Sequence, residues 1–139
     1  MKSTDLRIGN YVYYEHTTHI VSGIHGNKVY SWWVKDGEPV IEYEAKDISG
    51  TQVENPYIDV ISHYEPIPLT EEWLLKFEFK QYETIGIKTH NYIKGNFKFN
   101  SAVLWVAEYK GVHIENKILY VHQLQNLYFA LIGEELQLK

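Results

Sequence analysis

Hydrophobic and polar positions alternate over short runs in the first half of the chain, and each run ends at turn-forming residues. The runs cover residues 10–14, 18–24, 28–34, 39–43 and 56–64. Two segments between them, His25-Gly26-Asn27 and Asp36-Gly37, are typical of tight turns. A period of two, repeated at spacings of roughly 8–12 residues, predicts the short strands of a small antiparallel barrel.

The beginning of this half is similar to a known type of small barrel. Gly9 follows Ile8 and introduces the apolar strand that contains Tyr11 and Val12. A glycine placed before an apolar strand in this way resembles the first strand of SH3-like barrels. We therefore expect residues 5–66 to form an SH3-like antiparallel β-barrel.

The segment Glu65-Pro66-Ile67-Pro68 predicts a boundary between two parts of the chain. Proline fixes its own φ angle and disfavours helical backbone in the residue before it, so this segment is extended. It is too short to act as a flexible linker. We expect residues 67–139 to form a second unit that packs against the first.

The second unit begins with a short helix whose ends are marked in the sequence. Thr70 suits the N-cap, and Glu71 and Glu72 lie in the first turn, where the helix dipole favours negative charge. The helix is predicted to end near Phe77 or Glu78. Its apolar stripe consists of Trp73, Leu74 and Phe77.

Strands and a longer helix follow. The strand patterns lie at residues 84–89, 97–99, 102–109 and 112–115. A helix is predicted over residues 119–132, with Gly133 after its end. Its apolar stripe consists of Tyr120, Leu124, Leu127, Tyr128 and Leu131. The predicted fold class is α+β, an N-terminal SH3-like antiparallel β-barrel followed by an α-β-β-β-α unit.

Composition and charge exclude several classes of function. The chain has 139 residues, about the size of one domain, and no cysteine, which excludes disulfides, cysteine-ligated metals and cysteine nucleophiles. Residues 1–66 carry five basic and ten acidic side chains, and residues 67–139 carry eight of each. Binding to a polynucleotide is not expected, because phosphate contacts require a basic face.

The sequence also indicates where the protein acts. The first residues lack the apolar stretch of a signal peptide, and the longest apolar run, residues 102–107, is too short for a membrane helix. We expect a cytoplasmic protein with no membrane partner.

Motifs that would carry catalysis or bind a metal are absent from the sequence. His16 and His19 have a spacing of three, which places two strand side chains on opposite faces, and we interpret both as solvent-exposed turn residues. His113 is predicted to face away from the core, and His122 to have a surface or helix-packing role. No nucleophile motif or glycine-rich phosphate loop occurs. We predict no catalytic residue, no metal and no cofactor.

Aromatic residues are the unusual feature, at 15% of the chain. An excess lies in the first 45 residues, and two interpretations remain open. In one, a small barrel with few leucines uses tyrosine and tryptophan as core residues. In the other, the rings form a contact surface for a ligand or partner. The candidate binding residues are Tyr11, Tyr13, Tyr30, Trp32, Trp33 and Tyr43.

Three motifs resemble a family of small bacterial and prophage proteins that has no established activity. They are RIGNYV at residues 7–12, PIPLTEEWLLKF at residues 66–77 and HQLQNLYFAL at residues 122–131. Glu78 stands where the family pattern has glycine, and Ile132 where it has threonine. The resemblance implies an accessory protein of a phage or mobile element, acting in the cytoplasm of a bacterial host cell. It carries over no functional residues.

The leading hypothesis is a non-enzymatic binding protein that contacts a protein partner or small ligand through an aromatic-rich surface. A second hypothesis is a sponge that sequesters a nucleotide immune signal, with Lys88, Lys94 or Lys98 neutralising its phosphate. A third is a small hydrolase that uses a carboxylate or His122. Exposed aromatics would be covered in a symmetric homodimer, which we also expect.

Overall fold

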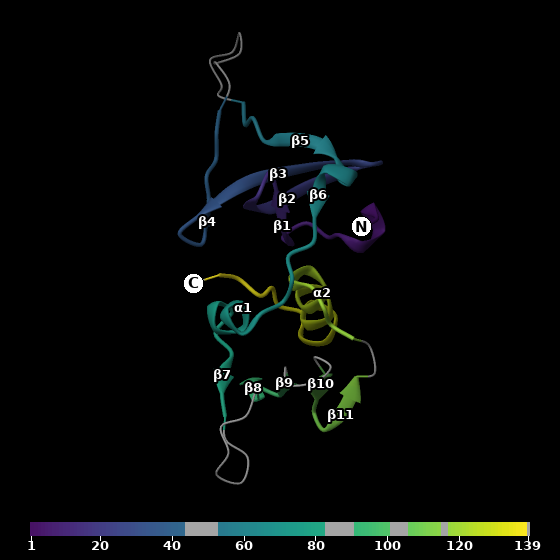
Figure 1. Cartoon of the computed structure of the whole chain (residues 1–139), viewed down its shortest axis with the longest axis vertical. Coiled ribbons are helices and arrows are strands. Elements are labelled where there is room, and N and C mark those ends of the chain that lie inside the picture. The colour runs from purple at the N-terminus through teal and green to yellow at the C-terminus, as the bar shows by residue number, and fades with distance from the viewer. Residues whose placement is uncertain (44–52, 83–90, 101–105, 115–116, 139) are drawn as a thin grey trace. The chain divides into compact units, whose positions relative to one another are not determined.

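Figure 1 shows the computed structural model of the chain, which describes residues 1–43, 53–82, 91–100, 106–114 and 117–138. The chain forms two compact units, Met1–Ile67 and Pro68–Lys139. Within the described ranges each unit holds an antiparallel sheet, and the second unit also holds two α-helices. The predicted α+β fold class is confirmed. Neither of these helices has the length and apolar composition that crossing a bilayer requires.

The N-terminal unit contains one sheet of six strands and two short 3₁₀ helices. Its elements are η1 (Ser3–Asp5), β1 (Tyr11–Tyr14), β2 (Thr17–His25), β3 (Lys28–Lys35), β4 (Glu38–Pro39), β5 (Tyr57–Val60), η2 (Ile61–His63) and β6 (Tyr64–Glu65). The hydrogen-bonded order is β4-β3-β2-β1-β6, and β5 also pairs with β3. β4 pairs with the last two residues of β3, and β5 pairs with its first four. Over the described residues the sheet is open, with β4 and β5 at one edge and β6 at the other (Figure 1).

The predicted turns of this unit are confirmed. Gly26, Asp36 and Gly37 have φ angles of 61°, 52° and 80°, the left-handed backbone that two-residue hairpins require. The predicted strand over residues 39–43 is wrong in extent, because β4 ends at Pro39 and Tyr43 pairs instead with Glu54 in an isolated bridge. The predicted strand over residues 56–64 is divided by η2, which turns the chain between β5 and β6.

One face of the N-terminal sheet carries its hydrophobic core. The buried cluster consists of Leu6, Val12, Val21, Val29 and Tyr64. Alternate residues of a strand point to the same face of the sheet, so β1, β2 and β3 each contribute one valine to this cluster. The partly buried side chains of Tyr14, Ile24 and Ile61 pack against it. A β-bulge between Val21 and Gly23 shifts the pairing of β2 with β3 by one residue.

The C-terminal unit contains a second antiparallel sheet and both α-helices. Its elements are α1 (Glu71–Lys76), β7 (Lys80–Gln81), β8 (Asn91–Lys94), β9 (Phe97–Asn100), β10 (Val106–Tyr109), β11 (Val112–Ile114) and α2 (Val121–Ile132). The strand order is β11-β10-β9-β8-β7, and both helices lie on the same face of this sheet (Figure 1).

The predicted α-β-β-β-α order is wrong in its number of strands, because the described residues place five strands between the helices. Strand β7 has two residues and β8 has four, which is too short for a period of two to be recognised in the sequence. The predicted strand at residues 84–89 and the first part of the one at residues 102–109 lie outside the described residues.

The cap of α1 and the end of α2 agree with the sequence, whereas α2 begins two residues later than predicted. The Thr70 side chain accepts a hydrogen bond from the Trp73 amide at 3.4 Å, as expected of an N-cap. Helix α2 begins at Val121 rather than residue 119, because the Gln123 side chain accepts from the backbone N–H of Tyr120 at 3.1 Å and caps the helix there. The predicted end at Gly133 is confirmed by a φ angle of 80°.

Helix α1 ends in a Schellman motif that places Glu78 in left-handed backbone. The Phe79 N–H donates to the Leu74 carbonyl at 2.9 Å, and the Glu78 N–H donates to the Leu75 carbonyl at 3.0 Å. Glu78 has a φ angle of 67°, and its side chain is exposed with its carboxylate 4.0 Å from Lys94 Nζ. Glycine adopts this backbone with no steric penalty, so a glutamate here is strained.

Replacement of Glu78 by glycine is therefore expected to stabilise the protein. Left-handed backbone costs a non-glycine residue roughly 1–2 kcal/mol, and the greater entropy of glycine in the unfolded chain offsets about half of the gain. We expect Glu78→Gly to raise the free energy of unfolding by about 0.5–1 kcal/mol, measured by urea denaturation. The matched Glu78→Ala variant removes the same carboxylate but keeps the strain, so an equal gain in both variants would contradict this explanation.

Aromatic rings fill the space between the second sheet and its helices. Phe97 and Phe99 on β9 are buried, as is Tyr128 on α2. The ring centroids of Phe97 and Tyr128 are 5.7 Å apart, and those of Phe97 and Phe79 are 5.9 Å apart. The apolar stripe of α1, Trp73, Leu74 and Phe77, is also buried, as predicted.

Candidate functional site

A pocket opens on the core face of the N-terminal sheet, where apolar side chains give way to aromatic and polar ones. It has a volume of about 220 Å³. Its lining residues are Tyr14, Glu15, Thr17, His19, Trp33 and Tyr57. The strand register brings them together from distant parts of the chain, because Tyr14 pairs with Thr17 on β2 and His19 pairs with Trp33 on β3.

The rings of the pocket contact one another at steep angles. The centroids of Tyr14 and His19 are 5.2 Å apart with an interplanar angle of 70°, and those of His19 and Tyr57 are 5.1 Å apart at 82°. Tyr14 and Tyr57 are 6.1 Å apart at 57°. Rings inclined in this way present faces in several directions. Trp33 and Tyr57, at 36% and 38% exposure, are open to solvent.

The floor of the pocket is held by a buried hydrogen-bond chain. His19 Nδ1 lies 2.9 Å from Ser31 Oγ, and Ser31 Oγ lies 2.9 Å from the Tyr64 hydroxyl. That hydroxyl donates to the Val29 carbonyl at 3.2 Å. A carbonyl only accepts, so the Tyr64 hydroxyl donates to Val29 and accepts from Ser31. Ser31 then accepts from His19, which places the imidazole proton on Nδ1 and the lone pair on Nε2.

Burial determines the charge of His19. The side chain is 2% exposed, and desolvation lowers its pKa from 6.5 to about 4. At neutral pH the imidazole is therefore uncharged, and the floor of the pocket carries no positive charge.

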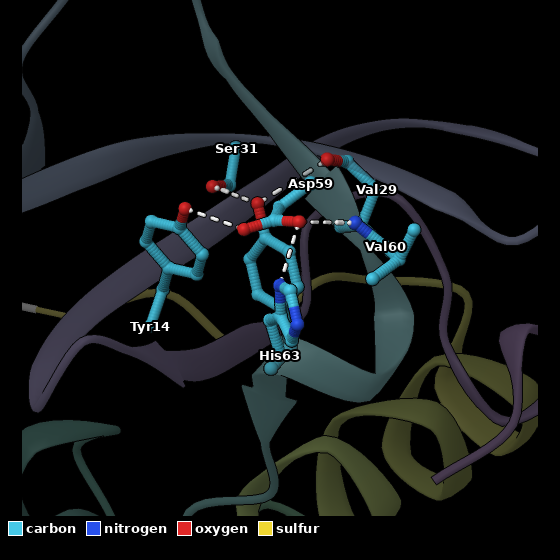
Figure 2. Close-up of polar contacts among 7 residues, drawn as sticks. Tyr14, Val29, Ser31, Asp59, Val60 and His63 are labelled. Carbon is cyan, nitrogen blue, oxygen red and sulfur yellow. Dashed lines mark hydrogen bonds and ion pairs between the residues drawn. The ribbon is translucent and has the colours of Figure 1, made fainter.

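One wall of the pocket rests on an ionised carboxylate (Figure 2). The Tyr14 hydroxyl donates to Asp59 Oδ2 at 2.8 Å, while Asp59 Oδ1 accepts from the Val60 amide and lies 2.7 Å from His63 Nδ1. These hydrogen bonds, the one with His63 foremost, lower the pKa of Asp59, and the bond to Asp59 raises the pKa of Tyr14 to about 12. The ring of Tyr14 also stacks on Tyr64, with centroids 4.7 Å apart. The Tyr14 ring is thus held in one orientation.

The rim of the pocket includes a strained turn. Glu15 and His16 have φ angles of 49° and 65°, although neither is glycine. The turn is tied at its base, where the Thr17 hydroxyl donates to the Tyr14 carbonyl at 2.8 Å. The left-handed backbone joins β1 to β2 tightly and places a carboxylate among the lining residues.

The candidate residues from the sequence are divided between the two faces of the sheet. Trp33 lines the pocket. By the strand register, the opposite face carries Tyr11, Tyr13, Tyr30 and Trp32. Tyr11 and Trp32 are buried, at 3% and 6% exposure, whereas Tyr13 and Tyr30 are half-buried. Tyr43 is 51% exposed and lies outside the strands and the pocket.

The other residues that line the pocket were not among the binding residues predicted from the sequence. Thr17, His19 and Tyr57 are separated by up to 40 positions in the sequence, and only the pairing of β2, β3 and β5 brings them together. The interpretation of His19 as a solvent-exposed turn residue is wrong, because the residue lies within β2 and its ring is buried against Ser31. A signal was present in principle, since a histidine at an apolar position of an alternating strand faces the core.

Among the described residues, the two other histidines that the sequence singled out have different surroundings. His122 is buried at the start of α2 and stacks on the Tyr120 ring, with centroids 5.9 Å apart, which confirms the helix-packing role among its two predicted ones. His113 is exposed, as predicted. Over the described residues, no group of three histidine or acidic side chains is placed to hold a metal ion.

The geometry gives no support to hydrolysis. His19 and Ser31 are at the hydrogen-bond distance of a base and its nucleophile. Ser31 has no exposed surface, however, so a substrate does not reach its hydroxyl. The site is therefore better suited to binding than to covalent chemistry.

The two described lysines among those proposed for phosphate binding belong to the C-terminal unit and are not among the residues that line the pocket. Lys94 donates to the Phe77 carbonyl at 2.7 Å and lies over the Tyr128 ring, within the C-terminal unit. Lys98 is exposed and lies over the Tyr82 ring, with 5.9 Å between Nζ and the centroid. Lys88 lies outside the described residues.

In comparisons with known proteins, no protein-family model, curated protein or solved structure matches the chain. Its function is therefore argued from the pocket and from the charges and rings that surround it.

Proposed function

We propose that the N-terminal unit is a non-enzymatic binding module that holds one side chain or small group of a partner in the pocket between Tyr14, Trp33 and Tyr57. The observation that supports this most is the presence of two partly exposed aromatic rings, Trp33 and Tyr57, over a buried floor in which His19 is hydrogen-bonded to Ser31 and Ser31 to Tyr64. Rigid aromatic side chains around a small depression are typical of binding hot spots.

The size of the pocket favours a small occupant. A volume of about 220 Å³ is below the roughly 300–1,000 Å³ of pockets that enclose drug-sized ligands. A nucleotide is of that larger class, so the volume does not favour the nucleotide sponge. One side chain of a protein partner fits the observed volume better.

The strand order supports an SH3-like description of this module as part of the same proposal. A strand order of β5-β3-β2-β1-β6, with the 3₁₀ helix η2 joining the two edge strands β5 and β6, is the arrangement expected of a partly open barrel of that kind. The resemblance of the sequence motifs adds the context of a phage or mobile-element accessory protein in the cytoplasm of a bacterial host. A homodimer that covers exposed rings belongs to the same proposal.

The proposal is tested by capture of ligands with pocket variants. Wild-type protein is immobilised and exposed to bacterial extract, and to a metabolite fraction of that extract. The same is done with Trp33→Ala, Tyr57→Ala and Tyr43→Ala. We expect a bound species that both pocket variants lose by about tenfold or more, because aromatic anchors dominate binding. Mass spectrometry quantifies the retained species.

Tyr43→Ala is the matched control, because Tyr43 is an exposed ring of the same unit that does not line the pocket. It should retain the species as well as the wild type does. Equal retention by all four proteins would place binding outside the pocket and contradict the proposal. Turnover of any captured small molecule by the wild type would contradict its non-enzymatic part.

A further inference from the structure

The chemistry of the pocket selects a class of occupant. Resting on the proposed function, we infer that the pocket takes a cationic side chain, a lysine or arginine presented by a protein partner, held between the aromatic faces of Tyr14, Trp33 and Tyr57 and the carboxylate of Glu15.

The aromatic lining favours a cation. The face of an aromatic ring carries partial negative charge and attracts an ammonium or guanidinium group within about 6 Å of the centroid. Tyr14, Trp33 and Tyr57 line one small volume, and the rings of Tyr14 and Tyr57 are inclined to each other by 57°. Tryptophan gives the strongest attraction of this kind.

The charged groups at the pocket also favour a positively charged occupant. Glu15 is an exposed lining residue at the turn between β1 and β2. Asp59 accepts a hydrogen bond from the Tyr14 hydroxyl at 2.8 Å, and its carboxylate is ionised at neutral pH because its hydrogen bonds lower its pKa. Among the described residues, those that line the pocket include no lysine or arginine, and His19 at its floor is uncharged at neutral pH because of its burial.

The charge of the whole unit acts in the same direction. Residues 1–66 contain five basic and ten acidic side chains. The summed negative potential attracts a basic partner over a longer range than the pocket itself and raises the rate of association. An anionic occupant such as a phosphate would be repelled by both the local and the overall charge.

The test uses four short peptides and the full chain. The peptides have the form acetyl-Gly-X-Gly-amide, where X is lysine, arginine, norleucine or glutamate. Norleucine keeps the aliphatic chain of lysine but has no charge. Binding is followed by NMR titration, with the Trp33 indole resonance identified by its absence in Trp33→Leu. We expect the lysine and arginine peptides to bind about tenfold or more tightly than the norleucine peptide.

Two further variants distinguish the effect of the Glu15 carboxylate on binding from the effect of the net charge of the unit. Glu15→Gln removes a charge at the pocket, whereas Glu42→Gln removes one from an exposed residue of the same unit that does not line the pocket. We expect Glu15→Gln to weaken the lysine peptide about fivefold and Glu42→Gln to change it less than twofold at 0.15 M salt.

Each remaining outcome overturns the inference. Equal binding of the norleucine and lysine peptides would show a pocket selected by shape and not by charge, and would leave the proposed binding function intact. Tighter binding of the glutamate peptide, or binding of none of the four, would overturn the cation inference. The capture experiment then decides separately whether the pocket binds a partner of another kind.

Discussion

Lowering the pH from 7 to 4 is expected to reduce the free energy of unfolding of the N-terminal unit by about 3 kcal/mol through His19 alone. Burial lowers the pKa of His19 from 6.5 to about 4 in the folded state. The unfolded chain therefore binds a proton that the folded chain does not. The stability that His19 contributes is complete above pH 6.5 and is lost progressively as the pH falls to about 4.

Urea denaturation at several pH values between 7 and 4 measures this loss, with amide NMR signals of β2 and β3 as the probe of the N-terminal unit. His19→Asn keeps a polar group near Ser31 but removes the titration, so its stability should change little over this range. His25→Asn is the control, because His25 is an exposed histidine of the same unit that lies at the end of β2. It should retain the wild-type pH dependence.

Asp59 provides an internal check on this interpretation. Its hydrogen bonds lower the pKa of its carboxyl group below 3.8, so the stability it contributes is present above that pH and is lost only at lower pH. The two losses therefore occur in different ranges. A wild-type protein whose stability is constant between pH 6.5 and 4 would contradict the buried, neutral state of His19.

Truncation of Phe97 to alanine is expected to reduce the free energy of unfolding of the C-terminal unit by about 3–5 kcal/mol. Phe97 has no exposed surface and lies within 5.7–6.5 Å, centroid to centroid, of Phe79, Phe99 and Tyr128. The substitution leaves a cavity at the contact between β9 and α2. Thermal and urea denaturation of the variant measure the loss.

Two variants show whether the cavity causes the loss. Phe97→Leu fills most of the same space and should cost about 1–2 kcal/mol. Phe129→Ala removes the same kind of ring from a residue of α2 that is 39% exposed, and should cost about 1 kcal/mol or less. Similar losses in Phe97→Ala and Phe129→Ala would show that Phe97 is not the centre of this core.

Features that depend on a few neighbouring residues could be predicted from the sequence. The Thr70 cap and the end of α2 at Gly133 depend on contacts within one helical turn. The turn at Asp36-Gly37 depends on the backbone preferences of two residues. Strands β7 and β8 were missed because elements of two and four residues show no recognisable periodicity, although β8 is joined to β9 by a tight turn that pairs Lys94 with Phe97.

The candidate site was predicted only in part, and a β-bulge is the main reason. A two-residue turn pairs His25 with Lys28, and an uninterrupted hairpin from there would place Ile20 opposite Trp33. The bulge between Val21 and Gly23 shifts the register by one, so that His19 lies opposite Trp33 instead. Gly23 inside the strand is compatible with a bulge, but a glycine alone does not fix the register of the pairing.

By itself, then, the sequence determined the α+β class, the helix boundaries near Thr70 and Gly133, and an excess of aromatic residues in the first 45 positions. Only the tertiary structure decided which of those rings share a face, since a one-residue change in strand register exchanges the two faces of a sheet. In the folded sheet, Trp33 lies on the same face as Tyr14 and Tyr57. Tyr11 and Trp32 lie on the opposite face and are buried there. Alternation along a strand is a local property, but pairing depends on the energy of the whole sheet.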